Sequence, residues 1–130
     1  MKEKLPDGLS PQNYESLAGV IDYITKEHGS LSAYTCLGVT LTYSEVDDLS
    51  SRFAKYLQTE TELKAGDKIA IQLLNLLQFP VVLFGAIKAG LIVVTTNPLY
   101  TSKEMEHQFK DSGVKAVVIL ESFCDKLEQI

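Results

Sequence analysis

The residues that decide the fold are 68–95, which read KIAIQLLNLLQFPVVLFGAIKAGLIVVT. Short runs of strand-forming residues at 69–74 and 91–95 enclose a longer apolar stretch, 79–89, that Gly90 follows. The short runs have the length and composition of strands, whereas the longer stretch has the length of a helix with a glycine at its end. The pattern therefore predicts a strand, a helix and a second strand in succession.

The same pattern continues toward the C-terminus. A helix is expected at residues 103–112, ended by Gly113, and a strand at 116–120, so that strands start about every 23 residues, the length of one strand–helix unit. Residues 92–94 and 117–120 are apolar on consecutive positions, which indicates strands buried on both faces in a parallel sheet covered by helices. The predicted fold class is α/β, a doubly wound parallel sheet.

The last residues, 123–130, are expected to begin another helix. Residues 101–104, Thr-Ser-Lys-Glu, form a capping box for the helix before it, and Ser122 with Asp125 approximates one for the last helix. The apolar stripe of this helix still runs at Ile130, with no glycine or proline cap after it. We therefore expect the chain to have been cut there.

The N-terminal half predicts a helix, a hairpin and a helix. Residues 42–45, Thr-Tyr-Ser-Glu, match the capping box and precede an apolar stripe of about four helical turns at 46–57. Before it, residues 33–43 are rich in Thr, Val and Tyr and broken by a glycine, which predicts a small β-hairpin. Residues 17–24 have helical spacing. Residues 1–13 are expected to be an extended lead-in to one partial α/β domain over 14–130.

Pro80 makes the start of the central helix ambiguous. If Asn75 is the N-cap, Pro80 removes an internal hydrogen bond, whereas a start near Gln78 puts Pro80 in the first turn, where its missing N–H is harmless. Both starts are compatible with the sequence. Asn75 itself is expected to be a helix cap rather than a ligand.

Composition excludes several classes of protein. With 130 residues, 45% hydrophobic and 22% charged, the chain has the composition of one globular domain. Its net charge is −5 and its basic residues form no stripe, which argues against binding to nucleic acid. Cys36 and Cys124 belong to no C-x-x-C pattern, so we expect reduced thiols in a cytosolic protein. The N-terminus lacks the apolar core of a signal peptide, and the 16-residue apolar stretch 79–94 is too short for a transmembrane segment.

The chain carries no phosphate-binding loop that the sequence can identify. It has no G-x-G-x-x-G, and although Gly85 and Gly90 have P-loop spacing, Leu91 and Ile92 follow where Lys and Ser or Thr are needed. Without the lysine ammonium and the Mg²⁺-binding hydroxyl, the glycine spacing does not indicate a nucleotide-binding P-loop.

A few side chains have the setting of functional groups. Glu104 and His107 stand at metal-ligand spacing, yet a single such pair fits a solvated helix face better. His28 precedes a helix-ending glycine, where it is expected to interact with the last carbonyls. Cys124 lies near a helix start, which favours a thiolate, but no histidine is near it in sequence, so we expect it to be buried or inert. We predict no catalytic, cofactor-binding or metal-binding residue in the segment.

Several stretches resemble one family, in the order and spacing that the family shows. Residues 41–46, LTYSEV, resemble the first core motif of adenylate-forming enzymes, and residues 87–100, IKAGLIVVTTNPLY, resemble the second. Residues 63–70, LKAGDKIA, are similar to the stretch that leads into the first strand of that family's sheet. Residues 75–81, NLLQFPV, and 111–116, DSGVKA, are most similar to bacterial long-chain fatty acid–CoA ligases.

The resemblance implies that residues 14–130 are the first part of the N-terminal domain of such a ligase. It implies ATP, Mg²⁺, coenzyme A and a long-chain fatty acid for the full-length enzyme, which forms an acyl-adenylate and then transfers the acyl group to the thiol of coenzyme A. The residues that do this lie downstream in the family, so the segment itself is expected to be inactive. A cytoplasmic location is implied, with homodimerisation and peripheral contact with the inner membrane left open. The alternative is a self-contained α/β module that binds a ligand or partner without catalysis.

Overall fold

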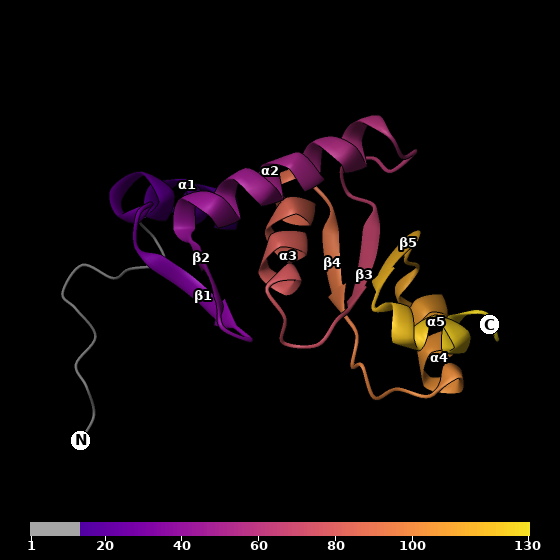
Figure 1. The fold of residues 1–130 in the computed structure, drawn as a ribbon. Coiled ribbons are helices and arrows are strands. Elements are labelled where there is room, and N and C mark those ends of the chain that lie inside the picture. The colour runs from indigo at the N-terminus through magenta and orange to yellow at the C-terminus, as the bar shows by residue number, and fades with distance from the viewer. Residues whose placement is uncertain (1–13) are drawn as a thin grey trace, which may run out of the picture.

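A parallel sheet of three strands lies at the centre of the described chain, residues 14–130, in the computed structural model (Figure 1). The strands, in the spatial order β4-β3-β5, are β3 (Lys68–Gln72), β4 (Ile92–Thr95) and β5 (Ala116–Ile119). Ile69 stands opposite Val93 of β4 and Ala116 of β5, so the central strand is paired on both edges. The predicted parallel sheet is confirmed, and the lead-in expected at residues 1–13 lies outside the described residues.

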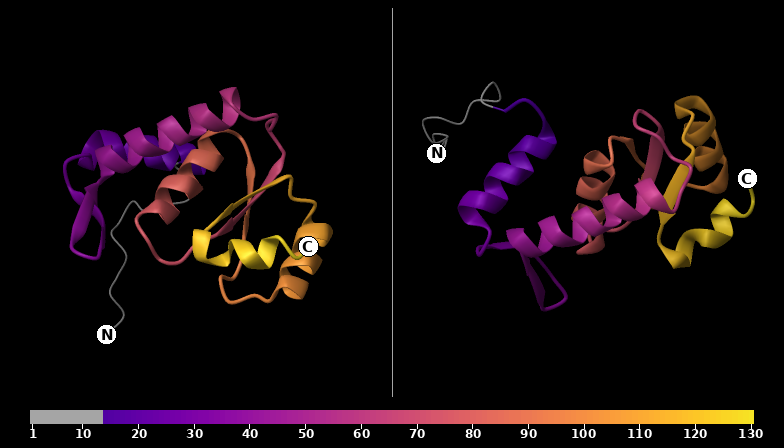
Figure 2. Two further views of the ribbon diagram at one scale, coloured as in Figure 1. Left: turned by 45° about the vertical axis from the view of Figure 1, so that its right-hand side comes forward. Right: turned by 90° about the horizontal axis from the view of Figure 1, so that it is seen from above.

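Helices flank the sheet on both faces. α3 (Gln78–Lys88) connects β3 to β4, and α4 (Ser102–Ser112) connects β4 to β5, on the other side of β3. Right-handed crossovers that run in opposite directions along a sheet put their helices on opposite faces. Figure 2 shows α3 and α4 on opposite sides of the strands. The doubly wound α/β fold predicted from the sequence is therefore confirmed.

The N-terminal half folds as the predicted helix, hairpin and helix. The elements are α1 (Leu17–His28), β1 (Ser32–Cys36), β2 (Val39–Thr42) and α2 (Tyr43–Thr59). β1 and β2 pair antiparallel and turn at Leu37 and Gly38, whose φ angles of 49° and 79° lie in the left-handed region. Figure 1 shows α2 running across α3, with the hairpin projecting away from the start of α2.

Both predicted capping boxes are present. The Glu45 carboxylate accepts from the Thr42 N–H at 2.8 Å, and the Thr42 hydroxyl accepts from the Glu45 N–H at 3.2 Å. Thr101 and Glu104 repeat the arrangement at the start of α4, at 2.8 and 3.4 Å. Donation from the backbone N–H of Thr42 and of Thr101 lowers the pKa of Glu45 and of Glu104 respectively. Each box satisfies donors that the first turn of a helix leaves free.

Replacing either capping threonine with alanine should lower the free energy of unfolding by about 1 kcal/mol at neutral pH, the usual contribution of an N-cap. Because the pKa of Glu45 and Glu104 is lowered in the folded chain, their charge stabilises the fold above the ordinary carboxyl pKa, and this contribution disappears as the pH falls through the folded value. Alanine keeps the backbone N–H but removes the threonine hydroxyl, which also donates to the carboxylate and contributes to its lowered pKa. The part of the Thr42→Ala and Thr101→Ala deficit that comes from this hydroxyl–carboxylate bond should therefore disappear in acid. Urea midpoints at pH 7 and near pH 4 measure this, and midpoints unchanged in both variants at pH 7 would contradict it.

The start of α3 corrects one sequence-based prediction. The helix begins at Gln78 with Leu77 as its N-cap, which makes no side-chain capping bond, so Asn75 is not the cap. Pro80 is then the third helical residue, where the first turn has no acceptor for its missing N–H. The exposed Asn75 lies in the β3–α3 loop and accepts a weak Cys36 S–H bond at its backbone carbonyl, 3.7 Å away.

The end of the chain corrects another prediction. A 3₁₀ turn, Glu121–Phe123, comes first, and α5 (Cys124–Leu127) follows, so the helix does not run to Ile130. The capping box expected from Ser122 and Asp125 is wrong, because Ser122 lies inside the 3₁₀ turn and Phe123, with no capping side-chain bond, precedes α5.

Only the central strand is buried on both faces. Ile69, Ala70 and Ile71 are at most 1% exposed. Ile92, at the start of the edge strand β4, is 50% exposed, and the strand β5 is half-buried throughout. The expectation that β4 and β5 are also buried on both faces is therefore wrong, because consecutive apolar residues do not distinguish an edge strand from a central one.

Gly85 allows α2 and α3 to approach each other closely. A Cβ atom added at Gly85 would lie 2.7 Å from Phe53 Cδ1 and 2.8 Å from the backbone carbonyl oxygen of Ser50, both on α2. Ser50 itself is fully buried at this contact. The glycine is thus required by the distance between the two helices rather than by its own backbone angles.

Lys88, at the end of α3, binds the same surface of α2. Its side chain is 13% exposed and its Nζ lies 2.5 Å from Asp47 Oδ1. The ammonium also donates to the Asp47 carbonyl and to the hydroxyls of Ser50 and Ser51, at 3.0–3.1 Å. Every proton of this largely buried cation therefore has an oxygen partner on α2.

Candidate functional site

Two loops meet at the carboxyl edge of the sheet. Residues 73–77 lead from β3 to α3 and residues 96–101 lead from β4 to α4, so the two adjacent strands send their connections to opposite faces. In doubly wound sheets, ligands bind outside the carboxyl ends of the strands, at such a switch point. This edge is therefore the candidate functional site of the described chain.

The β4–α4 connection contains a hydrogen-bonded turn at residues 97–100, which we call the Asn97 turn. Asn97 Oδ1 accepts from the Leu99 N–H at 2.9 Å, and the Asn97 carbonyl accepts from the Tyr100 N–H at 3.1 Å. From α5, Lys126 Nζ donates to the Tyr100 carbonyl at 3.0 Å. Leu99 is 80% exposed at the tip. The turn thus has a defined backbone and presents an apolar side chain outward.

Two glutamines that the sequence did not single out hold this connection. Gln72, the last residue of β3, is fully buried, and its Nε2 donates to the Asn97 carbonyl at 3.2 Å. Gln108 of α4 donates from Nε2 to the Thr95 carbonyl at 3.3 Å. A glutamine among the apolar residues of β3 was the only signal available, because the partner carbonyl becomes known only from the fold.

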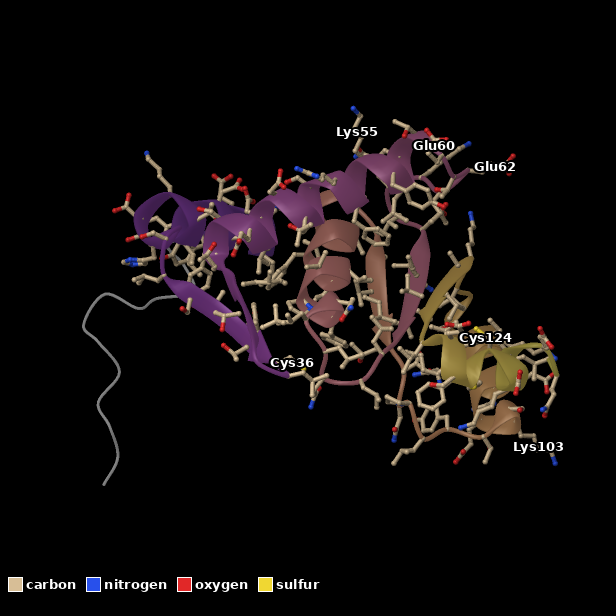
Figure 3. All side chains as sticks on the ribbon, viewed as in Figure 1. Cys36, Lys55, Glu60, Glu62, Lys103 and Cys124 are labelled. Carbon is tan, nitrogen blue, oxygen red and sulfur yellow. The ribbon has the colours of Figure 1, made fainter. Side chains whose placement is uncertain are left out.

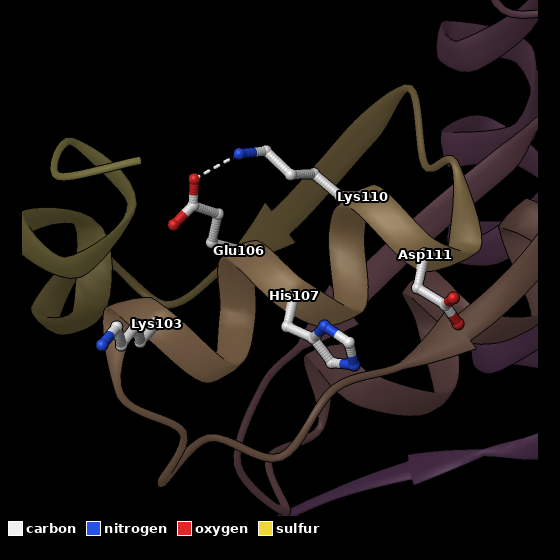
Figure 4. Close-up of a pocket in the computed structure, with 5 residues that line it drawn as sticks. All are labelled: Lys103, Glu106, His107, Lys110 and Asp111. Atoms are coloured by element: carbon white, nitrogen blue, oxygen red, sulfur yellow. Dashed lines mark hydrogen bonds and ion pairs between the residues drawn. The ribbon is translucent and has the colours of Figure 1, made fainter.

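The outer face of α4 has a shallow hollow lined by charged residues (Figure 4). Lys110 forms an ion pair with Glu106 one turn away and lowers the pKa of that carboxyl, chiefly through their hydrogen bond. His107 and Asp111 lie on the neighbouring part of the helix surface and are exposed. Side chains from a single helix surface do not converge on a common point, so the hollow has the features of a solvated face.

The Glu104–His107 spacing does not form a metal site in residues 14–130. The Glu104 carboxylate is used by the capping box with Thr101, and His107 is exposed on the outer face of α4. No three His, Cys, Asp or Glu side chains come together among the described residues in a way that could hold a metal ion.

The two cysteines are far apart and free (Figure 3). Cys36 ends β1 on the hairpin, whereas Cys124 starts α5 and donates weakly to the Leu120 carbonyl at 3.9 Å. Both thiols are half-buried. The reduced state of both thiols stays a prediction. The exposed His28 lies in the last turn of α1, and its interaction with the last carbonyls also stays a prediction.

An apolar groove that sequence reasoning missed runs between the hairpin, α2 and the start of α3. It has a volume of about 350 Å³. Its lining residues are Leu41, Leu49, Phe53, Leu77, Gln78, Val81 and Val82. The residues come from three separate elements, so no single stretch of sequence shows the groove. It holds no acid, base or nucleophile.

The described residues thus form a scaffold with a structured carboxyl edge. None of the helices in residues 14–130 has the length and apolarity that crossing a bilayer requires.

Sequence comparisons agree with this geometry. Residues 22–130 match the model of the AMP-binding enzyme family. The chain is 43% identical over 122 residues to a long-chain-fatty-acid–CoA ligase of Haemophilus influenzae. This match covers 94% of the present chain and 22% of the Haemophilus protein. The chain is also 40% identical over 126 residues to a long-chain-fatty-acid–CoA ligase of Salmonella typhimurium, a match that covers 97% of the present chain and 22% of the Salmonella protein. The chain therefore spans about a fifth of the length of these curated relatives.

A solved structure shows the same fold. The benzoate CoA ligase from Burkholderia xenovorans LB400 superimposes with a TM-score of 0.80 over 86% of this chain and 23% of that one, at 24% identity. At this identity, the likeness establishes the arrangement of helices and strands alone.

Proposed function

The chain belongs to the AMP-binding enzyme family, and we propose that it is the N-terminal part of a long-chain fatty acid–CoA ligase. The observation that carries the proposal is the 43% identity to the Haemophilus influenzae ligase over 94% of the chain. The match extends over 122 of the 130 residues, so the matched stretch includes the candidate site as well as the core.

The whole enzyme joins a fatty acid to coenzyme A in two steps. A carboxylate oxygen of the fatty acid attacks the α-phosphorus of Mg·ATP, and diphosphate leaves, which gives an acyl-adenylate. The sulfur of coenzyme A then attacks the acyl carbon, its proton passes to a base or solvent, and AMP leaves. The products are acyl-CoA, AMP and diphosphate.

Residues 14–130 contribute the scaffold at which this chemistry is assembled. The sheet fixes the Asn97 turn at the switch point, where ligands of doubly wound sheets bind. The described residues bring no set of acids together that fits Mg²⁺, so we assign the metal-binding acid, the phosphate loop and the adenylating lysine to the part of the ligase beyond this chain. The cytoplasmic location, membrane contact and homodimerisation stay predictions.

The isolated 130-residue chain should show no ATP–diphosphate exchange with palmitate, because no phosphate loop or adenylating lysine is identified in it. The measurement is incorporation of labelled diphosphate into ATP, with protein purified from a host that lacks its own ligase. Exchange above a blank without protein would overturn the assignment of chemistry to the rest of the enzyme.

A chimera tests the proposed function directly. This chain replaces the matching 122 residues of the Haemophilus influenzae ligase, and palmitoyl-CoA formation is measured beside the parent enzyme. We expect the chimera to retain activity, because the two segments are 43% identical over 122 residues. A folded chimera that binds ATP but forms no acyl-adenylate from palmitate or any shorter acid would contradict the proposal.

The coding sequence after Ile130 offers a further check, since a Ser/Thr/Gly-rich segment ending in Pro-Lys-Gly is expected there.

A further inference from the structure

Gln72 is a buried amide in a strand that otherwise has apolar residues at its centre. It ends β3, is fully buried, and donates from Nε2 to the Asn97 carbonyl at 3.2 Å. Its Oε1 is buried and accepts no hydrogen bond from the described residues. A methionine has a similar length and would fill the same space with no polar atom to satisfy. The amide must therefore be explained by the hydrogen bond that it makes.

The orientation of this amide follows from its partner. If the amide were turned over, Oε1 would face the Asn97 carbonyl oxygen at the distance now taken by Nε2, and two acceptors would repel each other. The donor must point at Asn97, which leaves Oε1 without a partner among residues 14–130. An unpaired buried acceptor is unfavourable. The buried Oε1 of Gln72 is therefore unfavourable for stability, and it accompanies the hydrogen bond that holds the Asn97 carbonyl from inside the core.

Gln108 repeats the arrangement from the other side of the connection. Its Nε2 donates to the Thr95 carbonyl at 3.3 Å, and its Oε1 is also buried without a partner among the described residues. One amide comes from the central strand and the other from α4, and they bind carbonyls two residues apart. The exit from β4 is held between the sheet and the helix.

The Asn97 carbonyl that Gln72 binds is also the acceptor of the Asn97 turn, because the Tyr100 N–H donates to it at 3.1 Å. We propose that Gln72 is a positioning residue that fixes the Asn97 turn at the carboxyl edge, so that Leu99 and Tyr100 are presented in one conformation before any ligand or further chain segment meets them. That this edge borders the substrate site rests on the proposed function, whereas the tether itself does not.

Hydrogen exchange separates a tether from a general contribution to stability. In Gln72→Met, the Leu99 and Tyr100 amides should exchange about tenfold faster than in the parent, the effect of losing one net hydrogen bond. The core amides of β3 should exchange no faster, because methionine fills the space and removes the unpaired oxygen. Faster exchange in the turn beside a core that exchanges no faster cannot come from a loss of global stability, which would speed both. Equal changes in both would overturn the proposal.

Gln72→Glu provides a rescue that pH controls. A protonated glutamic acid donates its O–H to the Asn97 carbonyl as the amide does, whereas the ionised carboxylate repels it, and burial raises the pKa of this introduced acid. The turn-to-core ratio of exchange rates, corrected for intrinsic rates at each pH, should match the parent below the raised pKa of the introduced acid and the methionine variant above it, with that pKa followed by the carboxyl carbon chemical shift in the same samples. A ratio that stays constant with pH would contradict the tether.

Gln108→Met is the matched control, and it should leave Tyr100 exchange unchanged. No assay here depends on ligase activity, so its failure is distinct from failure of the proposed function.

Discussion

Replacing Gly85 with alanine will destabilise the chain by about 3 kcal/mol, at the upper end of what overpacking usually costs. Helix propensity alone predicts the opposite, since alanine is about 1 kcal/mol better than glycine inside a helix. The new methyl group would lie 2.7 Å from Phe53 Cδ1 and 2.8 Å from the Ser50 carbonyl oxygen. The phenyl ring could turn, but the carbonyl belongs to the backbone of α2, so the whole helix must move. Urea denaturation measures the loss.

Gly19→Ala in α1 is the matched control. Among residues 14–130, a Cβ atom there meets only Ser16 Oγ at 3.5 Å, an ordinary contact. This substitution should stabilise the chain slightly, by about 0.5 kcal/mol, through helix propensity and a stiffer unfolded chain. If both glycine variants were stabilised alike, the close approach of α2 and α3 would not exist in solution.

Replacing Lys88 with methionine will destabilise the chain by about 2 kcal/mol, less than removal of one partner of a fully buried ion pair usually costs, because the Asp47 side chain is 32% exposed. Methionine keeps the length of the side chain but leaves Asp47 without its cation and the fully buried Ser50 hydroxyl without a donor. The expected loss of stability is therefore electrostatic rather than steric. It appears as a lower urea midpoint with an unchanged slope.

Two further variants identify the origin of that loss. Lys110→Met removes the exposed ion pair with Glu106 and should leave the midpoint close to that of the parent. Asp47→Leu combined with Lys88→Met removes both charges and should recover most of the stability that the single variant loses. A double variant as unstable as the sum of the two single variants would show that the pair does not interact.

The strands, the helices and both capping boxes could be predicted because each depends on residues close together in the sequence. Thr42 and Glu45 satisfy each other's backbone within one helical turn, so the spacing alone identifies the start of α2. A parallel sheet followed from short apolar runs repeated at the length of a strand–helix unit. These features need no knowledge of which element packs on which.

The features that were missed depend on the order of strands and on packing. Nothing in the sequence of residues 92–95 shows that β4 is an edge strand, so Ile92 was wrongly expected in the core. Asn75 has a good capping side chain, but the loop from β3 to α3 needs the residues up to Leu77. The roles of Gln72 and Lys88 require partners 25 and 41 residues away in the sequence. The candidate site could be located only through the switch point of the sheet.

The strand order β4-β3-β5 has a consequence for biosynthesis. The ribosome makes β3 first, yet this strand occupies the middle of the sheet and needs a neighbour on each edge. One edge stays open until Thr95 has been added and the other until Ile119 has been added. A nascent chain therefore carries the strand that is most buried in the folded sheet with an unsatisfied edge for most of the time that these residues are being translated. Unpaired edges and late, distant contacts are the conditions under which nascent polypeptides recruit chaperones or aggregate.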